Sequence, residues 1–150
     1  MGKRRVYFNE AGTRRSLGLL PETPLVTIIV PSYNQGTYIE ETIGSVLNQD
    51  YHVIELIIID GGSTDDTIEI LRRYDGDPRV RWVSEPDDGP LPACNKGLRC
   101  ATGDLVGIQL TSDTYQPEAV RGAVQEFAAD PQLAVVGGAV REVDAGGNPM

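Results

Sequence analysis

Short apolar runs alternate with segments of helical periodicity along this chain, and no other feature limits its fold as strongly. The runs lie at residues 25–30, 53–59, 80–83, 105–110 and 133–136. The first two leave almost no room for polar positions, which is typical of strands covered on both faces. Strands that alternate with helices pair in parallel through right-handed crossovers. The sequence therefore predicts an α/β protein, a three-layer α/β/α sandwich around a mostly parallel sheet.

Helix signals fill the intervals between these runs. The predicted helices span residues 38–47, 66–74, 93–100 and 117–128. Thr37 and Glu40 form a capping-box pattern at the start of the first helix. Residues 63–66 are of the types that favour helix starts, so they are assigned to capping of the second helix.

Length and composition predict one globular domain. The chain has 150 residues, of which 40% are apolar and 23% charged, and it has no apolar run of about eighteen residues that could span a bilayer. Its formal net charge is −9. This charge argues against a nucleic-acid partner, because phosphate binding needs clustered lysine and arginine.

The basic N-terminus is interpreted as a flexible extension, residues 1–23, ahead of the domain of residues 24–150. Residues 1–22 carry five basic side chains against two acidic ones. Such dispersed charge is typical of a solvated terminus, although it also suits peripheral contact with acidic lipid. No apolar signal segment follows the basic start, so we expect a cytoplasmic protein, with the inner face of the membrane as a second place of action.

The loop after the first strand argues against a dinucleotide-binding enzyme. Ligands of such sheets bind at the carboxyl ends of the strands. A glycine-rich phosphate loop should stand there, and residues 31–36 instead read Pro-Ser-Tyr-Asn-Gln-Gly. Tyr33 can stack on a base and Asn34 can pair with its polar edge, which suits a single nucleotide. A plain turn with a surface tyrosine explains the segment equally well.

Acidic residues end two of the other strands. Asp60 follows the second run, where a carboxylate can accept from a ribose hydroxyl or a base N–H. An Asx-turn or helix cap is the alternative. Asp113, preceded by Ser112, follows the fourth run, where oxygen ligands can hold Mg²⁺ or Mn²⁺ against a diphosphate. By itself this segment is more often a strand-to-helix turn.

Taken together, three longer segments resemble family 2 inverting glycosyltransferases. They read VTIIVPSYNQGTYIEETIGSVLNQDY, LIIIDGGSTDDTIEIL and WVSEPDDGPLPACNKGLRCATGDLVGIQLTSD. The family's order and spacing extend from about Leu25 to Gly138, and the DGGSTD and SEPD-x-G motifs are similar to a bacterial branch that builds surface polysaccharides. The resemblance implies a GT-A fold of the nucleotide-diphospho-sugar transferase type.

The resemblance also implies roles for the loop residues. The nucleoside of the donor would lie against Pro31, Ser32, Tyr33, Asn34, Asp60 and Gly61. The diphosphate and sugar would face Asp87, Asp88, Gly89, Asn95 and Lys96. A divalent cation, Mn²⁺ or Mg²⁺, would bind Asp113 with help from Ser112.

Three positions depart from the family's pattern. Gly61 stands where much of the family has a second acid, and Ser112 stands where an acid usually precedes Asp113. A single carboxylate is therefore left for the cation. Residues 90–92 read Pro-Leu-Pro where the similar branch usually has Ile-Tyr-Asp.

The implied reaction moves a sugar from a nucleoside-diphosphate donor, commonly a UDP-sugar, to a saccharide or lipid-linked acceptor with inversion. In the family, a carboxylate base deprotonates the acceptor hydroxyl while the diphosphate leaves. No residue before Met150 matches that base, so we expect a chain truncated at the C-terminus that carries the donor half and turns over nothing alone. The alternative is a degenerate, non-catalytic nucleotide-binding or interaction module.

Overall fold

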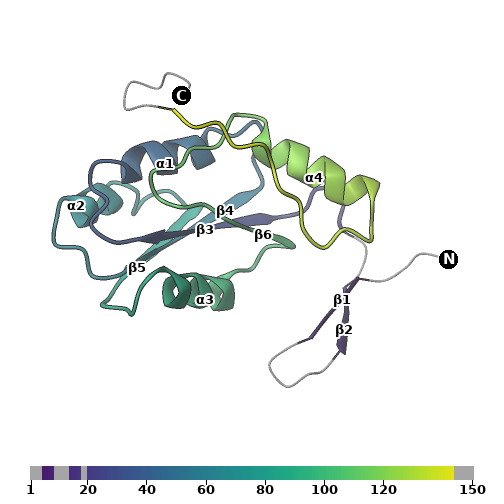
Figure 1. Ribbon diagram of the computed structural model, residues 1–150, viewed down its shortest axis with the longest axis horizontal. Coiled ribbons are helices and arrows are strands. Elements are labelled where there is room, and N and C mark those ends of the chain that lie inside the picture. Colours follow the sequence, from purple (N-terminus) through teal and green to yellow (C-terminus); the bar gives the residue numbers. More distant parts are fainter. Residues whose placement is uncertain (1–4, 9–13, 18–19, 144–150) are drawn as a thin grey trace. The chain divides into compact units, whose positions relative to one another are not determined.

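Four of the apolar runs pair as a parallel sheet in the order β5-β4-β3-β6 (Figure 1). The strands are β3 (Val26–Ser32), β4 (Ile54–Asp60), β5 (Val80–Ser84) and β6 (Leu105–Ile108). The computed structural model describes residues 5–8, 14–17 and 20–143, and this sheet belongs to a unit formed by residues 20–121. The predicted parallel pairing is confirmed.

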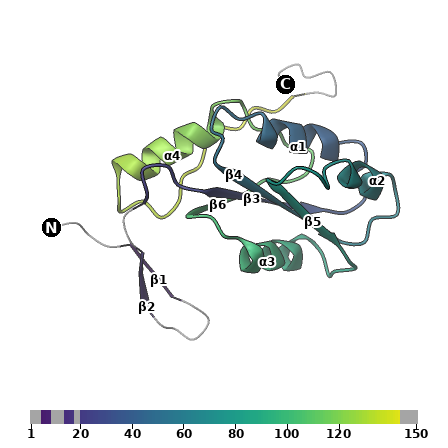
Figure 2. The ribbon, with the colours of Figure 1, turned by 180° about the vertical axis from the view of Figure 1, so that it is seen from behind.

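Helices cover both faces of this sheet. Helices α1 (Ile39–Leu47) and α2 (Thr67–Arg72) lie on one face, and α3 (Pro90–Cys100) lies on the other (Figures 1 and 2). Aliphatic side chains fill the space between the layers, and Ile29, Leu56 and Ile58 are fully buried there. The three-layer sandwich predicted from the sequence is confirmed.

Helix α1 starts without the predicted capping box. Its N-cap residue is Tyr38, and no described side chain caps it. The carbonyl of Gln35 accepts the N–H groups of Tyr38 and Ile39, both at 2.9 Å. Glu40 instead pairs with Arg73 at 3.3 Å. The box is unnecessary because the preceding backbone turn already supplies an acceptor for these N–H groups.

Helix α3 begins at Pro90, three residues before its predicted start, so residues 90–92 are helical rather than part of a loop. Gly89 precedes it with φ 111°, a conformation that favours glycine. Prolines suit the first turn because its N–H groups have no partner within the helix. Gly97 brings α3 close to β3, since a Cβ at that position would overlap Cγ2 of Ile29.

Strand β3 extends two residues into the predicted first loop. Pro31 and Ser32 pair with Ile59 and Asp60 of β4, whereas pairing with β6 stops at Ile29. Proline has no N–H to donate, so it fits a strand only where a neighbour has ended. Both residues are therefore buried parts of the sheet.

The second unit consists of residues 1–19 with 122–150. Within it, strands β1 (Arg5–Phe8) and β2 (Arg14–Leu17) pair antiparallel, and the sequence pattern did not point to either strand. Helix α4 (Ala119–Ala129) spans the division between the units. The fifth strand predicted over 133–136 is wrong, because these described residues have no strand pairing and Val135 is 80% exposed. An apolar run becomes a strand only where a neighbour completes its hydrogen bonds.

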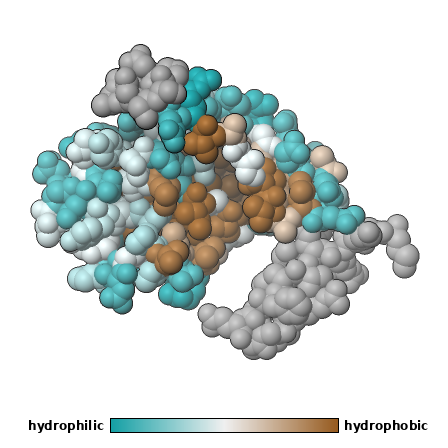
Figure 3. All heavy atoms as spheres, viewed as in Figure 1, coloured by the Kyte–Doolittle hydropathy of each residue, from teal (hydrophilic) through white to brown (hydrophobic). Residues whose placement is uncertain are grey.

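Apolar surface is concentrated around β6, an outer strand of the described sheet. Val106, Ile108 and Leu110 are each about half exposed. Figure 3 shows apolar side chains gathered over this region. Every helix within residues 5–8, 14–17 and 20–143 is too short or too polar to cross a membrane.

Candidate functional site

The carboxyl ends of β3, β4, β5 and β6 share one edge of the sheet because the strands are parallel. Hydrogen bonds join the loops at this edge. The Gly61 N–H donates to the Ser32 carbonyl at 2.8 Å, and the Thr111 hydroxyl donates to the Pro31 carbonyl at 2.6 Å. The loops after β4 and β6 therefore both contact the end of β3 at this edge.

Asn34 connects the first loop to the second. It has φ 51°, a left-handed conformation that asparagine tolerates better than most residues. Its N–H donates to the Ser63 hydroxyl at 2.7 Å, and its side-chain oxygen accepts from the Thr64 N–H at 2.8 Å. Tyr33 beside it is 58% exposed, so its ring is open to stacking.

Asp60 is fully buried at the end of β4. Its carboxylate accepts hydrogen bonds from the N–H groups of Gly62 and Ser63 at 3.1 and 2.8 Å. The hydroxyls of Ser63 and Ser84 donate to it at 2.5 and 2.7 Å. This geometry is that of the Asx-turn alternative, so Asp60 first fixes the shape of its own loop.

Capping of α2 differs from the prediction for residues 63–66. Asp65 alone bonds the helix start, where it accepts from the N–H and hydroxyl of Thr67 at 3.1 and 2.5 Å. Its other oxygen accepts from the Gly36 N–H at 2.8 Å. Burial by itself would raise the pKa of Asp65, but the hydrogen bonds from Thr67 and Gly36 hold that pKa below its ordinary value. Asp65 therefore ties the first loop to α2.

Asp87 brings the third loop against the second. A Cβ at Gly61 would lie 3.0 Å from Oδ1 of Asp87. The same oxygen accepts from the Gly89 N–H at 2.8 Å. The carboxylate of Asp87 therefore occupies the space that a side chain at position 61 would enter, which is a physical reason for glycine there.

The remaining predicted residues of the third loop and α3 have different surroundings. Asp88 and Asn95 are exposed. Lys96 is half-buried, and its ammonium lies 2.5 Å from Oε1 of Glu85. The carboxylate of Glu85 therefore already balances the charge of Lys96 within the protein. Ser32 contributes a buried hydroxyl that has no hydrogen-bond partner among the described residues.

Asp113 follows a strained turn after β6. Ser112 has φ 85°, a conformation that non-glycine residues rarely adopt unless their surroundings impose it. The Thr42 hydroxyl on α1 accepts from the Ser112 N–H at 3.3 Å and donates to the Asp113 carbonyl at 3.2 Å. The sequence pattern did not point to this contact, because Thr42 is simply one polar position in an amphipathic helix.

Comparison with known proteins identifies the family. Residues 27–149 match the profile described as Glycosyl transferase family 2. The chain belongs to this family. The Escherichia coli chondroitin synthase is 39% identical to it over 144 residues, which cover 95% of this chain and 21% of that protein. The Pasteurella multocida hyaluronan synthase is 40% identical over 127 residues, which cover 83% of this chain and 13% of that protein.

Solved structures support the GT-A type of fold for this family 2 chain. The mannosyltransferase PcManGT of Pyrobaculum calidifontis, in complex with GDP-Man and Mn²⁺, superposes with a TM-score of 0.67 and 33% identity over 77% of this chain and 35% of that one. TarS 1–349 of S. aureus, in complex with UDP-GlcNAc, superposes with a TM-score of 0.65 and 27% identity over 69% of this chain and 31% of that one. This chain spans about a fifth or less of the length of the two synthases named above and about a third of these two structures.

The family 2 chain can supply part of a cation site. The described residues contain no group of three or more histidine, cysteine, aspartate or glutamate side chains that could hold a metal ion. The exposed side chain of Asp113 offers one carboxylate. Mg²⁺ is commonly bound through one or two carboxylates, waters and the phosphates of a substrate. The donor set therefore fits a cation that is shared with a diphosphate, and not one held by protein alone.

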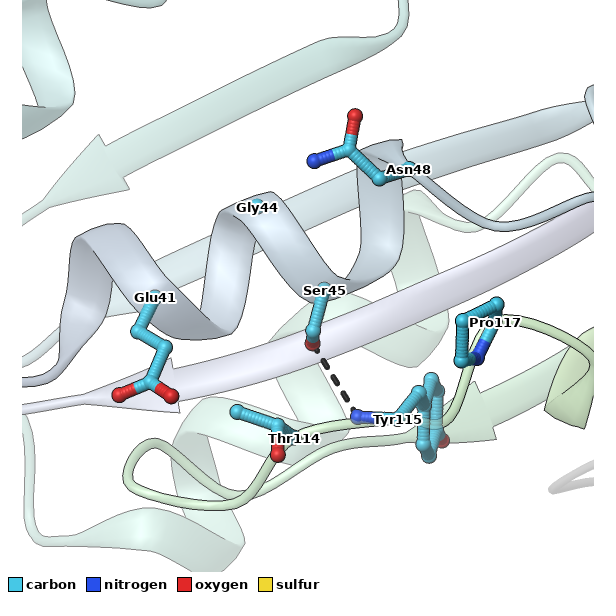
Figure 4. A pocket seen from close by; sticks show the side chains of 7 residues that line it. All are labelled: Glu41, Gly44, Ser45, Asn48, Thr114, Tyr115 and Pro117. Carbon is cyan, nitrogen blue, oxygen red and sulfur yellow. Dashed lines mark hydrogen bonds between the residues drawn. The ribbon is translucent and has the colours of Figure 1, made fainter. Parts of the chain in front are cut away.

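A cavity of about 350 Å³ lies between α1 and the segment after β6 (Figure 4). Its lining consists of Glu41, Gly44, Ser45, Asn48, Thr114, Tyr115 and Pro117. The donor-binding residues predicted from the sequence are not among them. Burial raises the pKa of Tyr115, and the charge of Asp113 raises it further. The cavity thus adjoins the Asp113 turn but differs from the predicted donor site.

Proposed function

We propose that this chain supplies the donor-binding part of a glycosyltransferase, which moves a sugar from a nucleoside-diphosphate donor to a saccharide or lipid-linked acceptor with inversion. The observation that carries the proposal is that the loops after β4 and β6 both contact the end of β3 at one edge of the sheet. Two structural relatives with bound UDP-GlcNAc or GDP-Man support it. We take a UDP-sugar as the donor and the cytoplasm as the place of action, with the inner face of the membrane as a second place.

The nucleoside is assigned to the first two loops. Tyr33 offers an exposed ring for stacking on the base. Asn34 lies beside it, held by Ser63 and Thr64. Pro31, Ser32 and Gly61 supply the backbone frame, and Asp60 shapes the second loop. Recognition of the base and ribose then falls mainly to groups whose positions the loop hydrogen bonds have already fixed.

The diphosphate is assigned to the third and fourth loops. Asp87, Asp88 and Asp113 are exposed acids, and like charges would repel a diphosphate there. When bound, Mn²⁺ or Mg²⁺ would neutralise this charge and polarise the diphosphate as a leaving group. Asp113 would hold the cation with help from Ser112. Gly89, Asn95 and Lys96, at the start of α3 and within it, would face the diphosphate and sugar.

The names of the curated relatives suggest where the transferred sugar goes. Two of them are synthases of chondroitin and hyaluronan, which are polysaccharides. We therefore propose polysaccharide assembly as the process in which the whole protein takes part. The base that deprotonates the acceptor hydroxyl is not assigned to any residue of this chain.

A specific observation favours a second candidate, a non-catalytic nucleotide-binding module. Ser112 leaves Asp113 as the single carboxylate of its turn, and Asp60 already accepts four hydrogen bonds within the protein. A module of this kind would bind a nucleotide without a cation.

Calorimetry with UDP, with and without Mn²⁺, separates the two candidates. The transferase proposal predicts binding that strengthens with Mn²⁺, and loss of that gain in Asp113→Ala. Glu118→Ala removes an exposed acid five residues farther along and serves as the matched control. UDP binding that is indifferent to Mn²⁺ and to Asp113→Ala would favour the non-catalytic module, and absence of UDP binding would contradict both.

A further inference from the structure

Helix α1 presents a row of polar side chains to the segment that follows β6. Thr42, Ser45 and Gln49 are three and four positions apart, so they lie on one face of the helix and the turn after it. Each bonds the backbone of residues 112–120. We call these three residues the α1 polar ladder.

The first two members hold the turn at Asp113. Thr42 is fully buried, and its hydroxyl bonds both the Ser112 N–H and the Asp113 carbonyl. Ser45 accepts from the Tyr115 N–H at 3.2 Å, the contact drawn as a dashed line in Figure 4. Ser45 also donates to the Thr42 carbonyl at 2.8 Å. Two side chains one helical turn apart thus bond three backbone groups of the turn.

The third member holds the far end of the same segment. Gln49 is 1% exposed. Its amino group donates to the carbonyls of Gln116 and Ser45 at 2.7 and 3.0 Å, and its oxygen accepts from the Val120 N–H at 2.9 Å. All the hydrogen bonds of this side chain go to backbone atoms, so it fixes the path of the backbone after β6.

The α1 polar ladder holds the strained backbone of the turn in place. A positive φ at Ser112 persists only where neighbouring contacts over-determine it. Thr42 supplies two such contacts, one on each side of the Ser112–Asp113 peptide. Loss of the hydroxyl would leave the Ser112 N–H and the Asp113 carbonyl without this partner and free the turn to relax. The direction of the Asp113 side chain would then change with its backbone.

We propose that Thr42 is a positioning residue for the cation and diphosphate, acting through the backbone of Asp113, with Ser45 and Gln49 extending the same hold. This inference rests on the proposed function, because the proposed function assigns a cation to the Asp113 carboxylate. Thr42 does not itself contact the ligand.

The test compares Thr42→Val, which keeps the shape but removes the hydroxyl, with Thr42→Ser, which keeps the hydroxyl. Mn²⁺ affinity is measured in the presence of saturating UDP, and UDP affinity is measured without metal. Loss of a group that orients a metal ligand typically lowers metal affinity about 10-fold or more. We expect a loss of about that size in Thr42→Val, recovery in Thr42→Ser, and unchanged metal-free UDP affinity in both.

Two further measurements keep the result independent of stability. Amide hydrogen exchange at Ser112 should become faster in Thr42→Val. In Ser45→Ala, exchange at Tyr115 should become faster and Mn²⁺ binding should become weaker. Ile43→Val removes a buried methylene next to Thr42 without touching the turn and controls for general destabilisation. It should leave Mn²⁺ affinity unchanged.

The outcomes separate the inference from the proposed function. Mn²⁺ affinity unchanged in Thr42→Val but lost in Asp113→Ala overturns the role of Thr42 and leaves the proposed function standing. An equal loss in Ile43→Val and Thr42→Val also overturns it. Wild-type protein without any metal-dependent UDP binding overturns the proposed function, and the inference with it.

Discussion

The carboxylate of Asp87 lies against Gly61, so close that a Cβ at position 61 would be 3.0 Å from its Oδ1. The resemblance expects an acid directly after Asp60. This chain has Gly61 at that position, and an acid from the loop after β5 lies in the adjacent space. A side chain at position 61 would therefore require the Asp87 carboxylate to move.

Gly61→Asp should displace Asp87 and break its hydrogen bond with the Gly89 N–H. Because the neighbour is the end of an exposed side chain that can move aside, we expect a loss of about 1 kcal/mol, mainly from that hydrogen bond. Chemical denaturation measures the loss. Gly76→Asp places the same side chain where nothing lies within 4 Å and should change stability little. Equal effects at the two glycines would contradict the displacement of Asp87.

Gly97→Ala should destabilise the contact between α3 and β3. Its Cβ would overlap Ile29, and we expect a loss of about 1–3 kcal/mol in the free energy of unfolding. Gly122→Ala, a helical position with open space around it, should instead be neutral or stabilising by up to about 1 kcal/mol. If the contact is direct, Gly97→Ala combined with Ile29→Ala is less destabilising than the two single losses added together. Strict additivity would argue against direct overlap.

Glu55 predicts a pH dependence of stability. Burial would raise its pKa, but hydrogen bonds from Thr27 and Thr102 and the charge of Arg81 hold that pKa below its ordinary value. A depressed folded-state pKa contributes stability above the unfolded value of about 4.3, and this contribution disappears as pH falls through the folded value. Glu55→Gln should lose about 1–2 kcal/mol at pH 7. It should lose less at pH 3, as urea unfolding at the two pH values would show; parallel pH curves for the two proteins would contradict this.

Ser112→Asp tests whether the turn at Asp113 faces a cation and lacks only a second carboxylate. Aspartate tolerates positive φ better than most residues, so the turn should accept it. A second carboxylate beside Asp113 should raise Mn²⁺ affinity in the presence of UDP, on the order of tenfold. Ser112→Asn keeps the size but not the charge and should give a smaller gain. No gain in Ser112→Asp would indicate that this turn does not face the cation.

Most of the fold could be predicted because its strands are locally self-evident. A run such as Ile54–Asp60, apolar on both faces, has few alternatives to a buried strand. Residues 133–136 have the same apolar character but no strand pairing within the described part of the chain, and sequence pattern carries no information about a neighbour. The predicted start of α3 is three residues late because proline favours a loop as well as the first helical position, and Pro90 occupies the second of these.

The sheet edge that carries the candidate residues was predictable, but the contacts between them were not. Tyr33, Asp60 and Asp113 could be placed at one edge because parallel strands share that edge. Burial of Asp60 within its own turn depends on hydroxyls from two loops, and no local pattern records them. The contact between Thr42 and Asp113 joins residues 71 positions apart, so only the folded chain reveals it.

The most direct test of the account is paramagnetic broadening of amide signals by Mn²⁺ in the presence of UDP, with Mg²⁺ as the diamagnetic reference. The account predicts that the signals of Asn34, Gly61, Asp88 and Asp113 broaden first, because the loops that carry them surround one cation. It predicts that Gly76 and Arg99 keep sharp signals. Broadening centred elsewhere, or broadening that does not change when UDP is left out, would contradict a shared cation-diphosphate site at this edge of the sheet.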